Sequence, residues 1–191
     1  MTLRRKDKRS GMTESHTGPP IGLRRRTVVV RDYDPQWHTE FLRASETLGR
    51  ILSGLAPRIE HVGSTAVPGL LAKPIIDIAI GFDRRGSLEE ARRLLSANGY
   101  EDQGDLGDEG GVFIVKRFGP RRTHYLHLIE VDSYQWRSLI AFREALRTDE
   151  ALRQHYATLK TSLAKRFARD RASYTAGKAE FIRDALKALS V

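Results

Sequence analysis

Residues 60–80 read EHVGSTAVPGLLAKPIIDIAI, and this stretch decides the fold. A short strand over 59–62 runs into the turn Gly63-Ser64-Thr65, and an apolar strand follows over 75–80. That second strand carries one carboxylate, Asp77, among isoleucines. Burying a carboxylate without a cation or metal beside it is costly. The pattern therefore predicts a charged functional site where the two strands meet.

A turn of this composition suits a phosphate chain. Gly63 presents backbone N–H groups with no Cβ in the way, and the hydroxyl of Ser64 adds a donor. After a gap of twelve residues from Ser64, Asp77 can hold Mg²⁺ or Mn²⁺ on the same phosphates. A Gly-Ser turn, a gap of this size and an acidic strand residue are typical of the nucleotidyltransferase fold.

One position departs from that pattern. The fold's second acidic residue, two positions after the first on the same strand face, is Ala79 here. We therefore expect Asp77 as the principal metal ligand, completed by phosphates, water, or a side chain of the neighbouring hairpin strand. His127 and Glu130 are the candidates there, although their odd spacing places them on opposite faces of a regular strand.

The remaining sequence predicts an α+β protein with a mixed sheet and a helical C-terminal part. The expected elements are a strand over 28–30, a helix opened by Asp34-Pro35 and ended near Gly54, a helix from Ser87 to Asn98-Gly99, a hairpin of 112–118 and 124–131, and helices over 134–147, 149–168 and 173–189. The acidic, glycine-rich stretch 101–111 is expected to be a mobile surface loop. The domain prediction is a disordered basic tail (1–26), a nucleotidyltransferase-like core (27–132) and a helical extension packed on it (133–191).

Composition excludes several classes of protein. The 191 residues include no cysteine, which excludes disulfide scaffolds, thiolate zinc sites and cysteine nucleophiles. No apolar run approaches the roughly 20 residues that span a bilayer, so we expect a cytoplasmic protein with no membrane partner. Of the net charge of +9, residues 1–26 carry +6 (eight basic and two acidic side chains), which leaves +3 for the rest. With no basic stripe in the core, we do not expect nucleic acid as the partner.

The stretch 60–78 closely resembles the GrpB-like family (UPF0157), a branch of the nucleotidyltransferase superfamily. The resemblance covers roughly 28–188. It also rests on Tyr33-Asp34-Pro35 with Trp37 and Phe41, on 124–128, on 142–146, and on Asp170-Arg171 with Tyr174, Lys178 and Phe181. It implies that Lys178 and Arg171 contact a triphosphate. It also implies two different roles, because GrpB-like proteins have been connected with phosphorylation of guanidino groups and such domains occur fused to dephospho-CoA kinases.

These observations together predict an ATP- and Mg²⁺-dependent transferase that phosphorylates a small cationic, arginine-like acceptor. Nucleotidyl transfer to a small molecule, or a catalytically silent nucleotide-binding module, are the alternatives. The expected roles are phosphate binding by Gly63, Ser64 and Thr65, charge neutralisation by Lys73, Arg121 and Arg122, metal binding by Asp77, and proton transfer or metal ligation by His127, with His124 as a further catalytic candidate. The acidic stretch would receive the cationic acceptor.

Two structural interpretations stay open at this point. Asp77 could form a buried ion pair with Lys73, Arg121 or Arg122 instead of binding a metal. The two strand histidines, His124 and His127, could be half-buried residues satisfied by the backbone.

Overall fold

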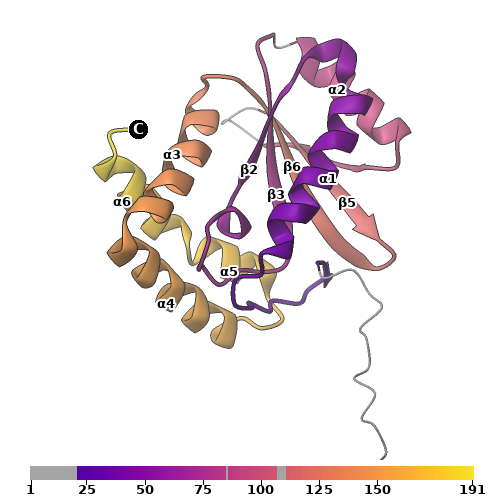
Figure 1. Ribbon diagram of the computed structural model, residues 1–191. Coiled ribbons are helices and arrows are strands. Elements are labelled where there is room, and N and C mark those ends of the chain that lie inside the picture. Colours follow the sequence, from indigo (N-terminus) through magenta and orange to yellow (C-terminus); the bar gives the residue numbers. More distant parts are fainter. Residues whose placement is uncertain (1–20, 85, 107–110) are drawn as a thin grey trace, which may run out of the picture.

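A computed structural model of the protein describes residues 21–84, 86–106 and 111–191. Its centre is a six-stranded mixed sheet (Figure 1). The strands are β1 (Leu23–Arg24), β2 (Arg58–Val62), β3 (Ile76–Phe82), β4 (Glu101–Asp105), β5 (Val112–Phe118) and β6 (Arg121–Glu130). They follow the order β2-β3-β6-β5-β4, and β1 pairs with the first residues of β6. Only the β3–β6 pair is parallel among these described strands.

Six α-helices are described around the sheet. They are α1 (Gln36–Ile51), α2 (Gly86–Ala97), α3 (Tyr134–Thr148), α4 (Glu150–Arg166), α5 (Arg171–Ala176) and α6 (Ala179–Ala188), with short 3₁₀ turns at Ser53–Leu55 and Ser64–Ala66. Figure 1 shows α3 to α6 grouped on one side of the molecule and α1 and α2 on the other. The predicted α+β class and helical C-terminal part are confirmed.

Strand alternation divides the core into two faces. Ile76, Ile78 and Ile80 of β3 pack with Leu126 and Leu128 of β6 against α1 and α2. The intervening residues face the other way, where Trp136 of α3 covers part of the sheet. Because Asp77 is one of these intervening residues, it lies on the side of the sheet that the C-terminal helices partly cover.

The predicted start of α1 is confirmed. The Asp34 carboxylate accepts a hydrogen bond from the Gln36 N–H at 2.9 Å, and Pro35 already has helical φ of −56°. Trp37, Phe41 and Leu48 bury the apolar face, as their spacing indicated.

Several predicted elements differ from the structure. Residues 28–30 are not a strand, because the Val28 N–H donates to the Ala168 carbonyl and the valine packs beside α4 and α5. Residues 21–26, assigned to a disordered tail, include β1 and bury Ile21; the rest of that tail lies outside the described residues. Ser87 lies inside α2 instead of capping it. The expected helix over 173–189 is divided into α5 and α6 at Gly177, where an added Cβ would lie 2.6 Å from Leu163.

The acidic stretch is also partly regular. Glu101–Asp105 forms the edge strand β4 instead of a loop, and residues 107–110 lie outside the described residues. Arg92 of α2 pairs with Asp102 and Asp105, and Arg117 of β5 pairs with Glu101. These ion pairs neutralise the carboxylates and allow the segment to join the sheet.

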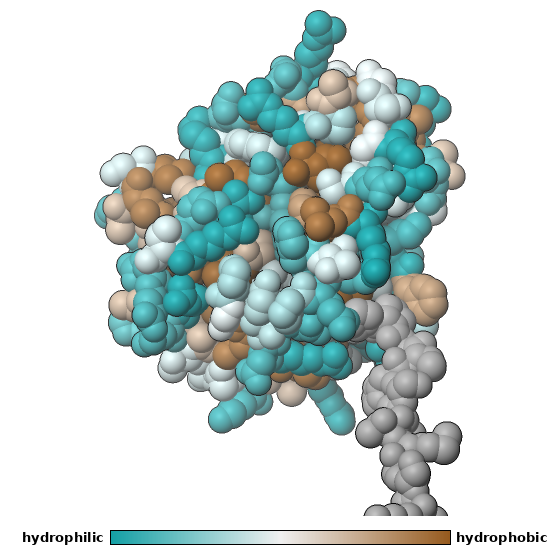
Figure 2. All heavy atoms as spheres, viewed as in Figure 1, coloured by the Kyte–Doolittle hydropathy of each residue, from teal (hydrophilic) through white to brown (hydrophobic). Residues whose placement is uncertain are grey.

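The outer surface is mixed in character. The face in Figure 2 is mostly hydrophilic, with small separate apolar patches. Within the part of the chain that the structure describes, no helix has the length and apolar character to cross a membrane.

Candidate functional site

The Gly-Ser turn lies directly against Asp77. Val62 at the end of β2 pairs with Asp77 of β3, and the chain turns at Gly63 with φ of +70°. An added Cβ at Gly63 would lie 2.8 Å from Oδ2 of Asp77, so only glycine fits this approach. The Ser64–Ala66 turn begins at once, and the first N–H groups of such a turn have no partner within it. Gly63, Ser64 and Asp77, which the sequence predicts to be neighbours, therefore lie next to one another.

A buried histidine holds this turn in place. His61 Nε2 lies 3.0 Å from Thr65 Oγ1, and the His61 ring stacks on Phe41 with centroids 4.7 Å apart. Burial lowers the pKa of His61 to about 3, so the ring is neutral at physiological pH. Thr65 is thus engaged in positioning the turn, and Ser64 is the turn's other polar side chain.

Asp77 and His127 share one face of the sheet. Nε2 of His127 lies 3.5 Å from Oδ1 of Asp77, and both side chains are partly exposed. The parallel register pairs Ala79 with His127, so His127 lies two residues along β6 from Tyr125, the strand partner of Asp77. Ala79 is buried in a cluster with Trp136. The place of the fold's second carboxylate is therefore covered by an apolar contact with α3.

Three lysines lie around this pair. Lys73 and Lys178 stand over the ring of Tyr174, with Nζ 4.9 and 5.0 Å from its centroid. Lys160 of α4 is 2% exposed, and its ammonium donates to the Leu71 carbonyl. Lys73 lies in the loop before β3, Lys160 lies in α4, and Lys178 immediately precedes α6.

Burial and mutual repulsion perturb these lysines. Desolvation, followed by the charge of Lys178, lowers the pKa of Lys73 to about 8. Desolvation also lowers the pKa of Lys160 well below its ordinary value and lowers that of Lys178. Asp77 acts in the opposite direction on all three, and one carboxylate faces three ammonium groups. A simple Asp77 ion pair therefore leaves an excess of positive charge, which a polyanion would balance.

Sequence reasoning found Lys73 and Lys178 but missed Lys160. A signal was present: Tyr156, Lys160 and Leu163 follow the i, i+4, i+7 spacing of a buried helix face, and all three are buried. A lysine in such a position needs a functional or structural reason.

The structure does not bring three predicted residues to this site. His124 and Glu130 alternate with His127 along β6 and fall on the face that carries Leu126 and Leu128. His124 instead lines a cavity of about 330 Å³ with Tyr100 and Lys116, and burial lowers its pKa to about 4. Arg121 is exposed at the start of β6, whereas its neighbour Arg122 is buried at a separate cavity beside the lysines.

The donor set fits a nucleotide-bound magnesium ion. No group of three or more His, Cys, Asp or Glu side chains in the described ranges could hold a metal ion. Mg²⁺ is commonly held by one or two carboxylates with phosphates and water completing its shell. Asp77 offers such a carboxylate, so the residues present fit a metal that arrives with phosphates.

Comparison with known proteins identifies the family. The family model described as "GrpB protein" matches residues 27–188. The chain belongs to the GrpB family. It is 37% identical over 161 residues to a UPF0157 protein of Pseudomonas aeruginosa, covering 81% of this chain and 64% of the relative. It is 28% identical over 170 residues to the glutamate-rich protein GrpB of Alkalihalophilus pseudofirmus, covering 87% of this chain and 98% of the relative.

Solved structures agree on the fold. The crystal structure of a GrpB protein from Enterococcus faecalis matches with a TM-score of 0.74 and 31% identity, over 85% of this chain and all of that one. The poly(U) polymerase Cid1 bound to MgGTP matches with a TM-score of 0.52 and 15% identity, over 72% of this chain and 45% of that one. The GrpB chain thus has the nucleotidyltransferase fold that its sequence predicted.

Relatives differ in length. The chain spans 64% of the Pseudomonas relative and 47% of the YqkA protein of Bacillus subtilis. It also matches 44% of a dephospho-CoA kinase of Mycolicibacterium paratuberculosis at 28% identity.

Proposed function

We propose that this GrpB protein is a nucleotide-dependent transferase that binds the triphosphate of ATP with Mg²⁺. The observation that carries the proposal is the set of three buried or half-buried lysines, Lys73, Lys160 and Lys178, around one carboxylate. Buried cations that repel one another need an anionic partner, and a triphosphate supplies several negative charges. The turn at Gly63 and Ser64 adds N–H and hydroxyl donors from the other side.

The two remaining roles, metal binding and proton transfer, are assigned to Asp77 and His127. A bound Mg²⁺ would supply Lewis-acid activation of the phosphates, and Asp77 is the residue that would hold it. Imidazole is not a preferred ligand of Mg²⁺, so we assign His127 to proton transfer. The acceptor's nucleophilic atom would bond to phosphorus as the bond to the leaving oxygen breaks. The acceptor's proton would pass to Nε2 of His127, while the lysines stabilise the negative charge that leaves.

Both phosphorus positions remain candidates for attack. Attack at the γ-phosphorus would release ADP and make the protein a kinase, the reaction expected from the sequence. Attack at the α-phosphorus would release pyrophosphate, which is nucleotidyl transfer. The likeness to a poly(U) polymerase favours the second only at the level of the fold.

The guanidino acceptor receives little support from the acidic stretch. Its three described carboxylates, Glu101, Asp102 and Asp105, are already paired with Arg117 and Arg92. Strand β4 is also separated from β3 by β6 and β5. Asp108 and Glu109 lie outside the described residues.

The test uses ATP labelled separately at the α and γ phosphorus, with Mg²⁺ and a pool of small metabolites that includes arginine and phosphorylated sugars. We expect label in an acceptor with wild-type protein and at least a hundredfold slower transfer with Asp77→Asn. The matched control is Asp83→Asn, an exposed carboxylate at the far end of β3 that pairs with Arg58. ATP that binds without transfer of either label would establish the silent nucleotide-binding module instead.

A further inference from the structure

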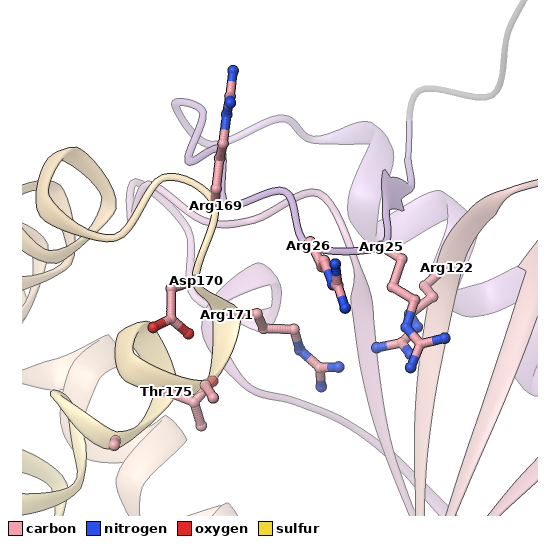
Figure 3. Close-up of a pocket in the computed structure, with 9 residues that line it drawn as sticks. Arg25, Arg26, Arg122, Arg169, Asp170, Arg171 and Thr175 are labelled. Atoms are coloured by element: carbon pink, nitrogen blue, oxygen red, sulfur yellow. The ribbon is translucent and has the colours of Figure 1, made fainter.

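A second cationic cavity lies beside the lysines. It has a volume of about 690 Å³ and is lined by Arg25, Arg26, Arg122, Arg169 and Arg171, with Asp170 as its one acidic neighbour (Figure 3). The arginines come from three parts of the chain: the segment after β1, the start of β6, and the turn into α5. The fold therefore gathers like charges that lie as much as 146 positions apart in the sequence (residues 25 and 171).

Among the residues that the structure describes, these charges have no counter-ion. None of the five arginines forms an ion pair or a side-chain hydrogen bond with another described residue. The Asp170 carboxylate is occupied, because it accepts hydrogen bonds from the N–H and the hydroxyl of Ser173 as the cap of α5. Arg122 is only 8% exposed, and the buried Nε atoms of Arg122 and Arg171 have no hydrogen-bond partner in the described structure. A buried guanidinium donor without an acceptor indicates a missing anion.

The guanidinium groups are aimed at a shared space. Figure 3 shows the side chains of Arg26, Arg171, Arg25 and Arg122 converging, whereas Arg169 extends away from them. Arg171 is fixed by stacking on Tyr125, with Cζ 5.0 Å from the ring centroid. Such fixed, convergent guanidinium groups recognise phosphate oxygens in bidentate fashion.

The cavity adjoins the proposed nucleotide site. Tyr125, on which Arg171 stacks, is the strand partner of Asp77. Arg122 and Arg171 both add to the repulsion that lowers the pKa of Lys73. The two cationic groups, three lysines and four convergent arginines, are therefore neighbours on one face of the sheet but are built from different side chains.

We propose that the arginine cavity binds a phosphate group of the acceptor, so that the acceptor is a small phosphorylated molecule. This inference rests on the proposed function, which assigns the triphosphate to the lysines. The cavity volume lies within the range of small-molecule sites, about 300–1,000 Å³. A phosphorylated acceptor would place its nucleophile toward Asp77 and His127 while its phosphate is held by the arginines.

The experiment measures two affinities by calorimetry on the full chain. The first titration follows binding of the non-hydrolysable analogue AMPPNP with Mg²⁺. The second follows inorganic phosphate, both without and with saturating AMPPNP. The variant is Arg26→Gln with Arg171→Gln, and the matched control is Arg169→Gln, which removes a nearby charge that points away from the others. Circular dichroism confirms that each variant is folded.

We expect the double variant to weaken phosphate binding at least tenfold and AMPPNP binding less than threefold, with both affinities unchanged in the control. Loss of phosphate binding whenever AMPPNP is bound would overturn the inference, because the arginines would then hold the nucleotide's own phosphates. If Arg169→Gln weakened phosphate binding as much as the double variant does, the inference would also be overturned, because the effect would then come from the overall positive charge. Displacement of phosphate by a ten-nucleotide RNA, with no response to ribose 5-phosphate, would assign the cavity to nucleic acid instead. Arginine-dependent phosphate binding in a protein that fails to bind AMPPNP would overturn the proposed function and leave the anion site standing.

Discussion

Two structural requirements at position 63, a positive φ and the absence of a Cβ, are both met by glycine. Its positive φ is unfavourable for other residues, and its missing Cβ lets the turn close against the Asp77 carboxylate. Gly69 separates the two effects, because it also has a positive φ, 78°, but an added Cβ there meets nothing within 4 Å.

We expect Gly69→Ala to lower the free energy of unfolding by about 1–2 kcal/mol, from backbone strain alone. Gly63→Ala should lower it by about 2–5 kcal/mol, because the contact with Asp77 adds to the strain. Urea unfolding measures both, and nucleotide binding should be lost only in Gly63→Ala. Equal destabilisation of the two variants would show that the approach to Asp77 is unimportant.

Because of Lys73, we expect the affinity for AMPPNP and the stability of the fold to change in opposite directions as pH rises. Its pKa in the free protein is about 8, below the ordinary value of 10.5. A bound polyanion keeps it protonated, so we expect affinity for AMPPNP to fall as pH rises above 8, approaching tenfold per unit. The unfolded chain binds the extra proton between pH 8 and 10.5, so stability should rise over the same window.

The variant Lys73→Arg tests the assignment, because arginine keeps its charge throughout this range. Its affinity should fall less steeply with pH than that of the wild type, with the residual slope due to Lys178. An unchanged slope would place the titration elsewhere.

At the scale of elements, α4 carries a lysine in a position suited to the core. Lys160 lies between Tyr156 and Leu163 on the buried face of the helix. Its desolvation is unfavourable for folding, and the Leu71 carbonyl and the ring of Tyr156 offset only part of it.

We therefore expect Lys160→Met to raise the free energy of unfolding by about 1–3 kcal/mol and to weaken AMPPNP binding at least tenfold. Thermal denaturation and calorimetry provide the two readouts. Lys165→Met, at the end of the same helix on an exposed surface, is the control and should change neither by more than about 0.5 kcal/mol. A less stable Lys160→Met protein with unchanged affinity would assign the lysine a purely structural role.

Local signals explain what the sequence analysis predicted at this scale and what it missed. The turn at Gly63 and the strand that holds Asp77 lie fourteen positions apart, and their chemistry is visible within that short stretch. Strand β4 was expected to be a loop because the arginines that neutralise it, Arg92 and Arg117, belong to other elements. The arginine cavity was missed for the same reason, since Arg26 and Arg171 meet only in the folded chain.

At the scale of the whole molecule, the two cationic groups make the unliganded protein less stable than its core would allow. Self-repulsion of concentrated like charge opposes folding, and a bound polyanion relieves it. The same charge offers a simple test that does not depend on the reaction catalysed.

We expect inorganic tripolyphosphate to raise the melting temperature, with a stabilisation of about 2.7 kcal/mol at a concentration one hundred times its Kd. The variant Lys160→Met should start from a higher melting temperature and gain less from the ligand. Differential scanning calorimetry at fixed ionic strength makes the comparison, with sodium chloride of matched ionic strength as the control. An equal rise in melting temperature with sodium chloride would show that the stabilisation comes from general charge screening and not from binding of the polyanion.

The arginine cavity also has a consequence for synthesis of the protein. Its convergent arginines include Arg25 and Arg26, near the beginning of the chain, and Arg171, and the lysine that shares Tyr174 with Lys73 is residue 178. A nascent chain therefore has no complete anion site until the ribosome has passed residue 178, however early the sheet forms. Ligand binding can thus assist only the last step of folding, the docking of the C-terminal helices.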